Sequence, residues 1–146
     1  MVENRNLPVS ALLSGLGRDA TARVRRAIRP LGLGAQQFLV LQQLAMLGEA
    51  SQAELADALA IDRSNLASIA TALCEHGLAE RRRDERDRRR YVLRLSRAGE
   101  RLLRRAEGAL AAAEEDLLGP LGQRQRDQLY ALLRQLADGV ELCPVM

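Results

Sequence analysis

The chain has 146 residues, enough for one domain with a sizeable core but too few for two comfortable independent ones. The formal net charge of +3 at pH 7 and the pI near 9.5 give only a mild indication of a nucleic-acid partner. Two widely separated cysteines, no signal-peptide pattern and no apolar run of about 18 residues argue against a secreted disulfide scaffold and a membrane protein. We therefore expect a soluble, cytoplasmic protein with no membrane partner.

Helical periodicity dominates the first half of the chain. Apolar residues from Leu12 to Ile28 predict an amphipathic helix that the Pro- and Gly-containing segment 30–34 stops. Residues 35–46 are apolar nearly all round, which is typical of a helix buried in the middle of a fold. Ser51 and Glu54 have the spacing of a capping box that starts a short helix, and Asp62 is placed to cap another running to Gly77.

The pattern changes after Gly77. Residues 78–81 and 91–95 read as two strands that flank a charged tip at 84–88, which predicts a β-hairpin with a long loop. A long helix is expected from Ser96, a break at 119–122, and a last helix with apolar residues up to Val140. The predicted fold class is mainly α with a small β-hairpin.

The two helices between Gln52 and Leu73 fit a helix-turn-helix, which needs apolar residues where its helices meet and a small residue facing the partner helix. The inner positions are Leu55, Leu59, Ile61, Leu66 and Ile69, with Ala56 as the small residue and Ala60 at the turn. The outward positions that begin the second helix are Arg63, Ser64, Asn65, Ala67 and Ser68. Short polar side chains there suit the major groove, and Asn can pair bidentately with adenine. The same pattern also fits an ordinary helix pair in an all-helical protein.

The basic surplus of the chain lies in the predicted hairpin. Nine arginines and four acids occupy residues 80–97, whereas the rest of the chain holds thirteen arginines and fifteen acids. An arginine-rich hairpin directly after a candidate recognition helix is typical of the wing of a winged helix, which reaches phosphates and the neighbouring minor groove. The wing residues expected at DNA are Arg82, Arg86, Asp87, Arg88, Arg89 and Arg90.

With these residues identified, the sequence resembles the MarR family of bacterial winged helix-turn-helix transcriptional regulators from about Val9 to Ala137. The most specific part is Gly77-Leu78, Arg81-Arg82, Asp84, Asp87-Arg88-Arg89 and Leu95-Ser96-Arg97-Ala98-Gly99, with serine replacing the usual threonine at position 96. The resemblance implies that Arg89 enters the minor groove, that Asp87 holds the wing by pairing with an arginine, and that residues 63–76 form the recognition helix. Ser68 departs from the family, in which many members have arginine at that position.

The resemblance also implies an architecture and a mechanism. The single chain 1–146 would comprise a DNA-binding lobe at 35–95 and a helical dimerisation region at 9–30 and 97–140. The flanking helices carry more apolar surface than one small lobe covers, which also favours a homodimer. The implied function is a ligand-responsive repressor that binds double-stranded DNA at a palindromic operator, with a small, often aromatic effector between the dimer helices and the lobe.

Two alternatives remain at this point. One is a redox-sensing regulator that uses Cys74 or Cys143, although Cys74 also fits a small buried residue. The other is a nucleic-acid-binding protein without sequence preference. We expect no cofactor and no metal site, because Cys74 and His76 would point to different faces of their helix. An enzyme is not expected, since the chain has a single histidine and no evident nucleophile or paired carboxylates.

Overall fold

The computed structural model describes residues 7–139. Val140, expected at the end of the last helix, and Cys143, one of the two candidate redox cysteines, lie outside this range. The elements in chain order are α1 (Val9–Ile28), the 3₁₀ helix η2 (Arg29–Leu31), α2 (Ala35–Leu47), β1 (Glu49–Ala50), α3 (Gln52–Leu59), α4 (Arg63–Glu75), β2 (Ala79–Arg83), β3 (Tyr91–Leu95), α5 (Arg97–Leu118) and α6 (Gln123–Ala137). The predicted fold class, mainly α with a small β-hairpin, is confirmed.

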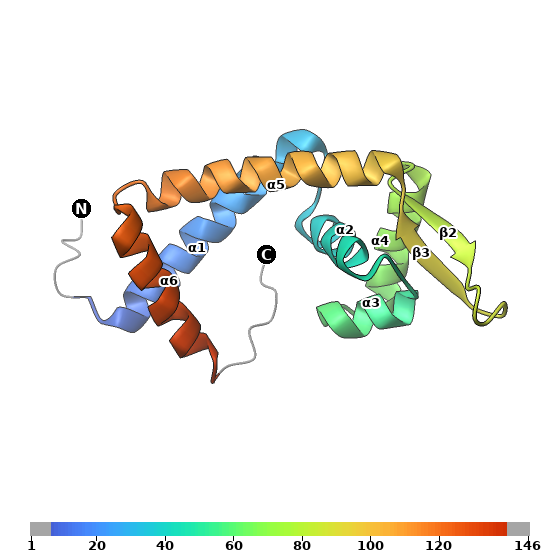
Figure 1. Cartoon of the computed structure of the whole chain (residues 1–146), viewed down its shortest axis with the longest axis horizontal. Coiled ribbons are helices and arrows are strands. Elements are labelled where there is room, and N and C mark those ends of the chain that lie inside the picture. Colours follow the sequence, from blue (N-terminus) through green and yellow to red (C-terminus); the bar gives the residue numbers. More distant parts are fainter. Residues whose placement is uncertain (1–6, 140–146) are drawn as a thin grey trace.

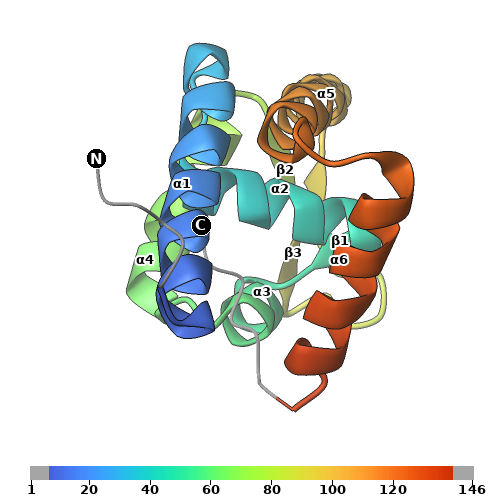
Figure 2. The same cartoon turned by 90° about the vertical axis from the view of Figure 1, so that its left-hand side faces the viewer.

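The elements form an elongated molecule with two ends, and α5 runs between them (Figure 1). At one end α1 packs against α5, and α6 folds back from the last turn of α5. At the other end α2, α3, α4 and the β2–β3 hairpin form a separate lobe. Viewed from the first end, α1 and α6 stand on opposite sides, and α5 lies above α6 at the level of the upper part of α1 (Figure 2). None of the helices within residues 7–139 has the length and apolar character needed to cross a membrane.

Local chemistry sets the helix boundaries in the lobe. Ser51 caps α3 by accepting the backbone N–H of Glu54, whose carboxylate returns to the Ser51 backbone N–H, so the predicted capping box is confirmed. Asp62 caps α4, also as predicted. The helix ends at Glu75 and Gly77 follows with φ of 67°, a left-handed conformation that glycine adopts without strain.

Three strands form one antiparallel sheet in the order β1-β3-β2. Ala79 is paired with Leu95, and the register continues to Arg83 opposite Tyr91. The hairpin is therefore confirmed, but β2 reaches Arg83, two residues further than its sequence pattern predicted, because Tyr91 and Val92 offer backbone partners there. Strand β1 was not predicted, since its two residues, which pair with Leu93 and Arg94, are too few to show any periodicity.

The core of the lobe confirms the helix-turn-helix interpretation. All five predicted inner positions pack in or against the core, with Leu55 and Leu66 fully buried and Ile61 partly buried. Ala56 is 2% exposed at the helix contact. Ala60 holds the turn with φ of 50°, the left-handed conformation for which glycine is common. Phe38, Val40, Leu41 and Leu44 of α2 are buried, as predicted for a central helix.

One junction attaches the hairpin to α5. The Ser96 hydroxyl donates to the carbonyl of Gly77 at 2.6 Å and accepts the Gly99 N–H at 3.0 Å. The Ser96 N–H donates to the carbonyl of Leu78 at 3.1 Å. Both ends of the hairpin are therefore bound to the first turn of α5, which connects the lobe with the other end of the molecule.

Candidate nucleic-acid interface

The N-terminus of α4 is organised by one carboxylate. Asp62 accepts the backbone N–H groups of Ser64 and Asn65, each at 3.0 Å, and the hydroxyl of Ser64. These hydrogen bonds lower the pKa of Asp62, and those from the two backbone N–H groups have the largest effect. The carboxylate therefore stays ionised and continues to cap α4 throughout the neutral range. The cap contributes to stability above the unfolded pKa of this group, and that contribution is lost as the pH falls through the lower folded value.

The predicted recognition residues do lie together on the first two turns of α4. Arg63, Ser64 and Ser68 are exposed, whereas Asn65 and Ala67 are partly buried. Arg63 makes a loose ion pair of 3.8 Å with Asp57 of α3 while its side chain stays 74% exposed. The Ser68 hydroxyl donates to the carbonyl of Ser64 at 3.2 Å, so this short side chain lies along the helix.

The Asn65 side chain has a partner that the sequence did not reveal. Its Nδ2 donates to Oε1 of Gln36 in α2 at 3.0 Å. The amide NH₂ carries two hydrogens, so one remains, together with Oδ1, for a second partner. Gln36 thus fixes the orientation of the residue predicted to read adenine. No local pattern could show this, because the two residues are 29 positions apart.

The wing loop is held in shape by two aspartates. Asp84 Oδ1 accepts the Arg86 N–H at 2.8 Å, and Asp87 Oδ1 accepts the Arg89 N–H at 3.0 Å. Both are side chain to backbone bonds two residues ahead, the arrangement by which aspartate stabilises turns. The Arg90 carbonyl accepts the Asp84 N–H at 2.9 Å and closes the loop.

The resemblance implied that Asp87 pairs with an arginine side chain, and this expectation is wrong for the structure. The ion pairs found among residues 7–139 do not include Asp87, whose carboxylate binds the Arg89 backbone instead. The physical reason is local: a carboxylate two residues before an N–H reaches it with little loss of conformational freedom. Asp87 still shapes the wing, but through the main chain.

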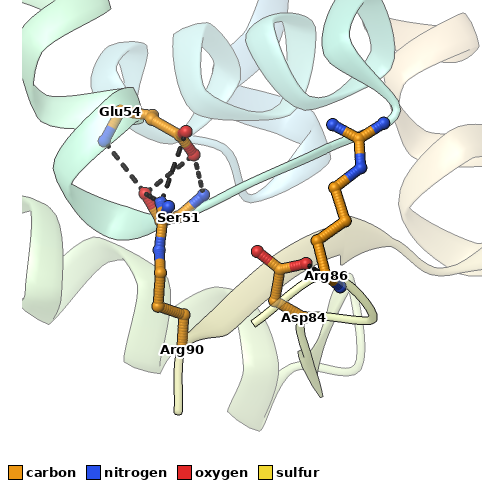
Figure 3. A network of polar contacts seen from close by, with 5 residues as sticks. All are labelled: Ser51, Glu54, Asp84, Arg86 and Arg90. Carbon is orange, nitrogen blue, oxygen red and sulfur yellow. Dashed lines mark hydrogen bonds and ion pairs between the residues drawn. The ribbon is translucent and has the colours of Figure 1, made fainter. Parts of the chain in front are cut away.

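The predicted wing arginines fall into two groups. Arg82, Arg86, Arg88 and Arg89 are exposed, and their guanidinium groups have no ion-pair or hydrogen-bond partner in the described part of the chain. Arg90 differs, because its Nη2 lies 3.2 Å from the Ser51 hydroxyl and 3.4 Å from Oε1 of Glu54 (Figure 3). Arg83, which the sequence did not single out, stacks over the Tyr91 ring at 5.6 Å and donates to the Arg88 carbonyl.

The arrangement suits a polyanion rather than chemistry on a small substrate. Four exposed guanidinium groups without an ion-pair partner within residues 7–139 lie on the braced hairpin, and α4 of the same lobe exposes short polar side chains. No group of three or more His, Cys, Asp or Glu that could hold a metal ion occurs within residues 7–139. Cys74 is a partly buried free thiol that packs against the hydrophobic core.

Comparison with known sequences places the lobe in a family. The model of the MarR family matches residues 31–90. A putative transcriptional regulatory protein for the hcr operon of Thauera aromatica is 35% identical over 125 residues, covering 83% of this chain and 75% of that protein. The transcriptional repressor NicR of Pseudomonas putida is 31% identical, covering 96% of this chain and 98% of that protein.

Comparison with solved structures gives the same fold. Wild-type MarR of Escherichia coli in its apo form has a TM-score of 0.80 at 21% identity, covering 91% of this chain and 98% of that one. BpsR of Bordetella bronchiseptica, solved to explain how 6-hydroxynicotinic acid regulates its DNA binding, has a TM-score of 0.72 at 25% identity, covering 94% and 99%. The braced wing, the capped recognition helix and these relatives agree: the chain belongs to the MarR family of transcriptional regulators, with a winged helix-turn-helix as its DNA-binding unit.

Proposed function

We propose that this protein is a homodimeric repressor that binds a palindromic operator, with α4 in the major groove and the wing over the adjacent minor groove. The observation that carries this proposal is the group of exposed wing arginines that have no ion-pair partner within residues 7–139, on the hairpin that directly follows α4. Arg63, Ser64, Asn65, Ala67 and Ser68 would face base edges, while Arg82, Arg86, Arg88 and Arg89 would contact phosphates and the minor groove. The name of NicR, a repressor, supports the direction of regulation.

The dimer proposal rests on where apolar side chains are exposed. Seven of the eleven exposed large hydrophobic residues in the described chain lie on α1 and α6, at the end of the molecule away from the lobe. Leu132 and Leu136 are 60% and 61% exposed and lie one helical turn apart on α6. A concentrated apolar surface of this kind marks an interface, and a second copy of the chain is its proposed occupant. The helices α1, α5 and α6 would then form the dimerisation region.

Replacing both Leu132 and Leu136 by glutamate is expected to convert the dimer into a monomer, because two charges cannot be buried there unpaired. Sedimentation equilibrium should give twice the 16.1 kDa chain mass for the wild type and a single chain for the variant. The control is the pair Met46→Glu and Leu47→Glu, which adds the same charges to exposed apolar positions of α2 and should leave the dimer intact. A leucine variant that remains dimeric contradicts the assignment of this interface.

We also propose that the protein responds to a small aromatic acid. An open space of about 1060 Å³ lies over the surface of α1 and the first residue of η2, bordered by Arg18, Arg25, Arg26 and Arg29. Guanidinium groups bind carboxylates in bidentate geometry, and BpsR is a relative whose DNA binding is regulated by such an acid. Adding 6-hydroxynicotinic acid to the protein–operator complex should lower the DNA affinity, whereas uncharged nicotinamide should have little effect. If neither compound changes the affinity for DNA, aromatic acids are excluded as effectors of this protein.

A further inference from the structure

Ser51 is the centre of a polar network at the start of α3. It is the one buried polar side chain in the described part of the chain, at 7% exposed. Its hydroxyl donates to Glu54 Oε2 at 2.8 Å and accepts both the Glu54 N–H at 3.2 Å and Arg90 Nη2 at 3.2 Å. A hydroxyl has one donor and two acceptor sites, so the bonding capacity of this group is fully used.

Arg90 comes to this network from the wing, 39 residues further along the chain (Figure 3). Its Nη2 contacts both the buried hydroxyl and Glu54 Oε1, the latter at 3.4 Å. The hydrogen bonds from Ser51, together with Arg90, lower the pKa of Glu54, so its carboxylate is ionised and available to Arg90 in neutral solution. The other arginines of the wing loop have no acidic partner of this kind within residues 7–139.

The contact of Arg90 with Ser51 and Glu54 lies where it can restrain the wing. The short strand β1 holds β3 only at Leu93 and Arg94, so beyond Leu93 the wing continues as a two-stranded ribbon. A two-stranded hairpin alone is marginally stable and twists easily. Arg90 lies beyond the last β1 pairing, at the base of the loop, and its guanidinium group joins this ribbon to the start of α3 by a hydrogen bond and an ion pair.

We propose that Arg90 is a positioning residue, which holds the wing at a fixed angle to the helix-turn-helix through Ser51 and Glu54 rather than binding a phosphate. This proposal rests on the proposed DNA-binding function and changes the role predicted for Arg90 within it. The remaining wing arginines supply the charge at the DNA, and the Arg90 contact determines where that charge is presented.

The variant Glu54→Gln gives opposite results under the two roles of Arg90. Glutamine keeps an acceptor oxygen for the Ser51 N–H, so the capping box and α3 are retained while the ion pair is removed. If Arg90 were a phosphate contact, removing a nearby negative charge would strengthen DNA binding. If Arg90 positions the wing, the same variant weakens binding about fivefold at each half-site, the upper effect of an exposed ion pair, and about 25-fold for a dimer, with an unchanged salt dependence.

The duplex for this test is first selected from a random pool with the wild-type protein. Its Kd is then measured at several salt concentrations for Glu54→Gln, Arg90→Gln and the double variant. The expected result is a similar weakening in all three, since the double variant removes the same contact. Arg88→Gln serves as the comparison and should flatten the salt slope by about 0.9 for each phosphate that the arginine no longer neutralises. Tighter binding by Glu54→Gln, or a flattened slope for Arg90→Gln, overturns the proposal.

A second readout needs no DNA and separates this proposal from the proposed function. Hydrogen exchange at the Asp84 and Arg90 amides should be about fivefold faster in Glu54→Gln, because the tether no longer restrains the loop. The control Asp57→Asn also removes one negative charge from α3, but its ion pair is with Arg63 of α4. Exchange at the Asp84 and Arg90 amides should therefore match the wild type in this variant. Unchanged exchange in Glu54→Gln contradicts the positioning role even if DNA binding is confirmed. Failure of the wild type to bind any duplex, with faster exchange in the variant, instead contradicts the DNA-binding function.

Discussion

Gly99→Ala is expected to lower the stability of the fold by about 3 kcal/mol, because an added methyl group has no space at this position. A Cβ on residue 99 would overlap the carbonyl oxygen of Leu78 and lie 3.3 Å from Cδ2 of Leu95. The Leu78 carbonyl cannot move freely, since it accepts the Ser96 N–H and the next residue, Ala79, is paired with Leu95. The clash therefore strains the junction that joins the hairpin to α5.

Thermal unfolding followed by circular dichroism measures this effect, and the expected fall in Tm is on the order of 10 °C. Gly108→Ala is the matched control, because it adds the same methyl group to the same helix at an exposed position, where no atom other than those of the adjacent residues and the surrounding helix backbone lies within 4 Å. Alanine is the better helix former, so Gly108→Ala should raise the stability by up to about 1 kcal/mol. If both variants unfold at the wild-type temperature, the close packing of Gly99 on Leu78 is wrong.

Arg89→Gln is expected to weaken DNA binding about tenfold at each half-site, and about a hundredfold for a dimer, whatever the DNA sequence. The Arg89 backbone is fixed by the Asp87 carboxylate, while its guanidinium group is exposed and unpartnered within residues 7–139. The Arg89 side chain can therefore bind DNA without first breaking an ion pair or hydrogen bond to another described residue. Removal of its charge should also reduce the slope of log Kd against log salt by about 0.9 for each phosphate that it neutralises.

Fluorescence titration of a labelled operator over a range of salt concentrations measures both quantities. Arg104→Gln, an exposed arginine of α5 outside the lobe, removes the same charge and should change neither affinity nor slope appreciably. Asn65→Ala should instead alter which sequences are preferred, because its amide is held by Gln36 in position to read a base. A salt slope for Arg89→Gln equal to that of the wild type is incompatible with the wing assignment.

Much of the fold could be predicted because its determinants are local in the sequence. Ser51 and Asp62 start their helices with side chain to backbone bonds that span two or three residues. Leu55 and Leu66 follow the helical period and are buried as that period requires. The MarR family resemblance was confirmed. The concentration of arginine between residues 80 and 97 also favours the hairpin as the DNA-contact surface, and this assignment stays a prediction.

What could not be predicted depends on residues that are distant in sequence. Gln36 meets Asn65, and Glu54 meets Arg90, only after the lobe has folded. Composition placed Arg90 with the other wing arginines, yet its guanidinium group contacts Ser51 and Glu54 at the start of α3, whereas those of Arg88 and Arg89 have no ion-pair partner within residues 7–139. Strand β1 could not be predicted for a similar reason. Its two residues show no strand pattern of their own and become a strand by pairing with Leu93 and Arg94 of β3.

The proposed function requires sequence-specific recognition of a symmetric site, which can be tested by selecting bound duplexes from a random pool at a fixed salt concentration. A dimer with one recognition helix in each subunit should enrich an inverted repeat whose half-sites are about 10 base pairs apart, or a multiple of that spacing. Each mismatch introduced into a half-site should then weaken binding roughly fivefold to a hundredfold. Recovery of no common sequence, or equal affinity for the selected and scrambled duplexes, would contradict sequence-specific recognition and favour nucleic-acid binding without sequence preference.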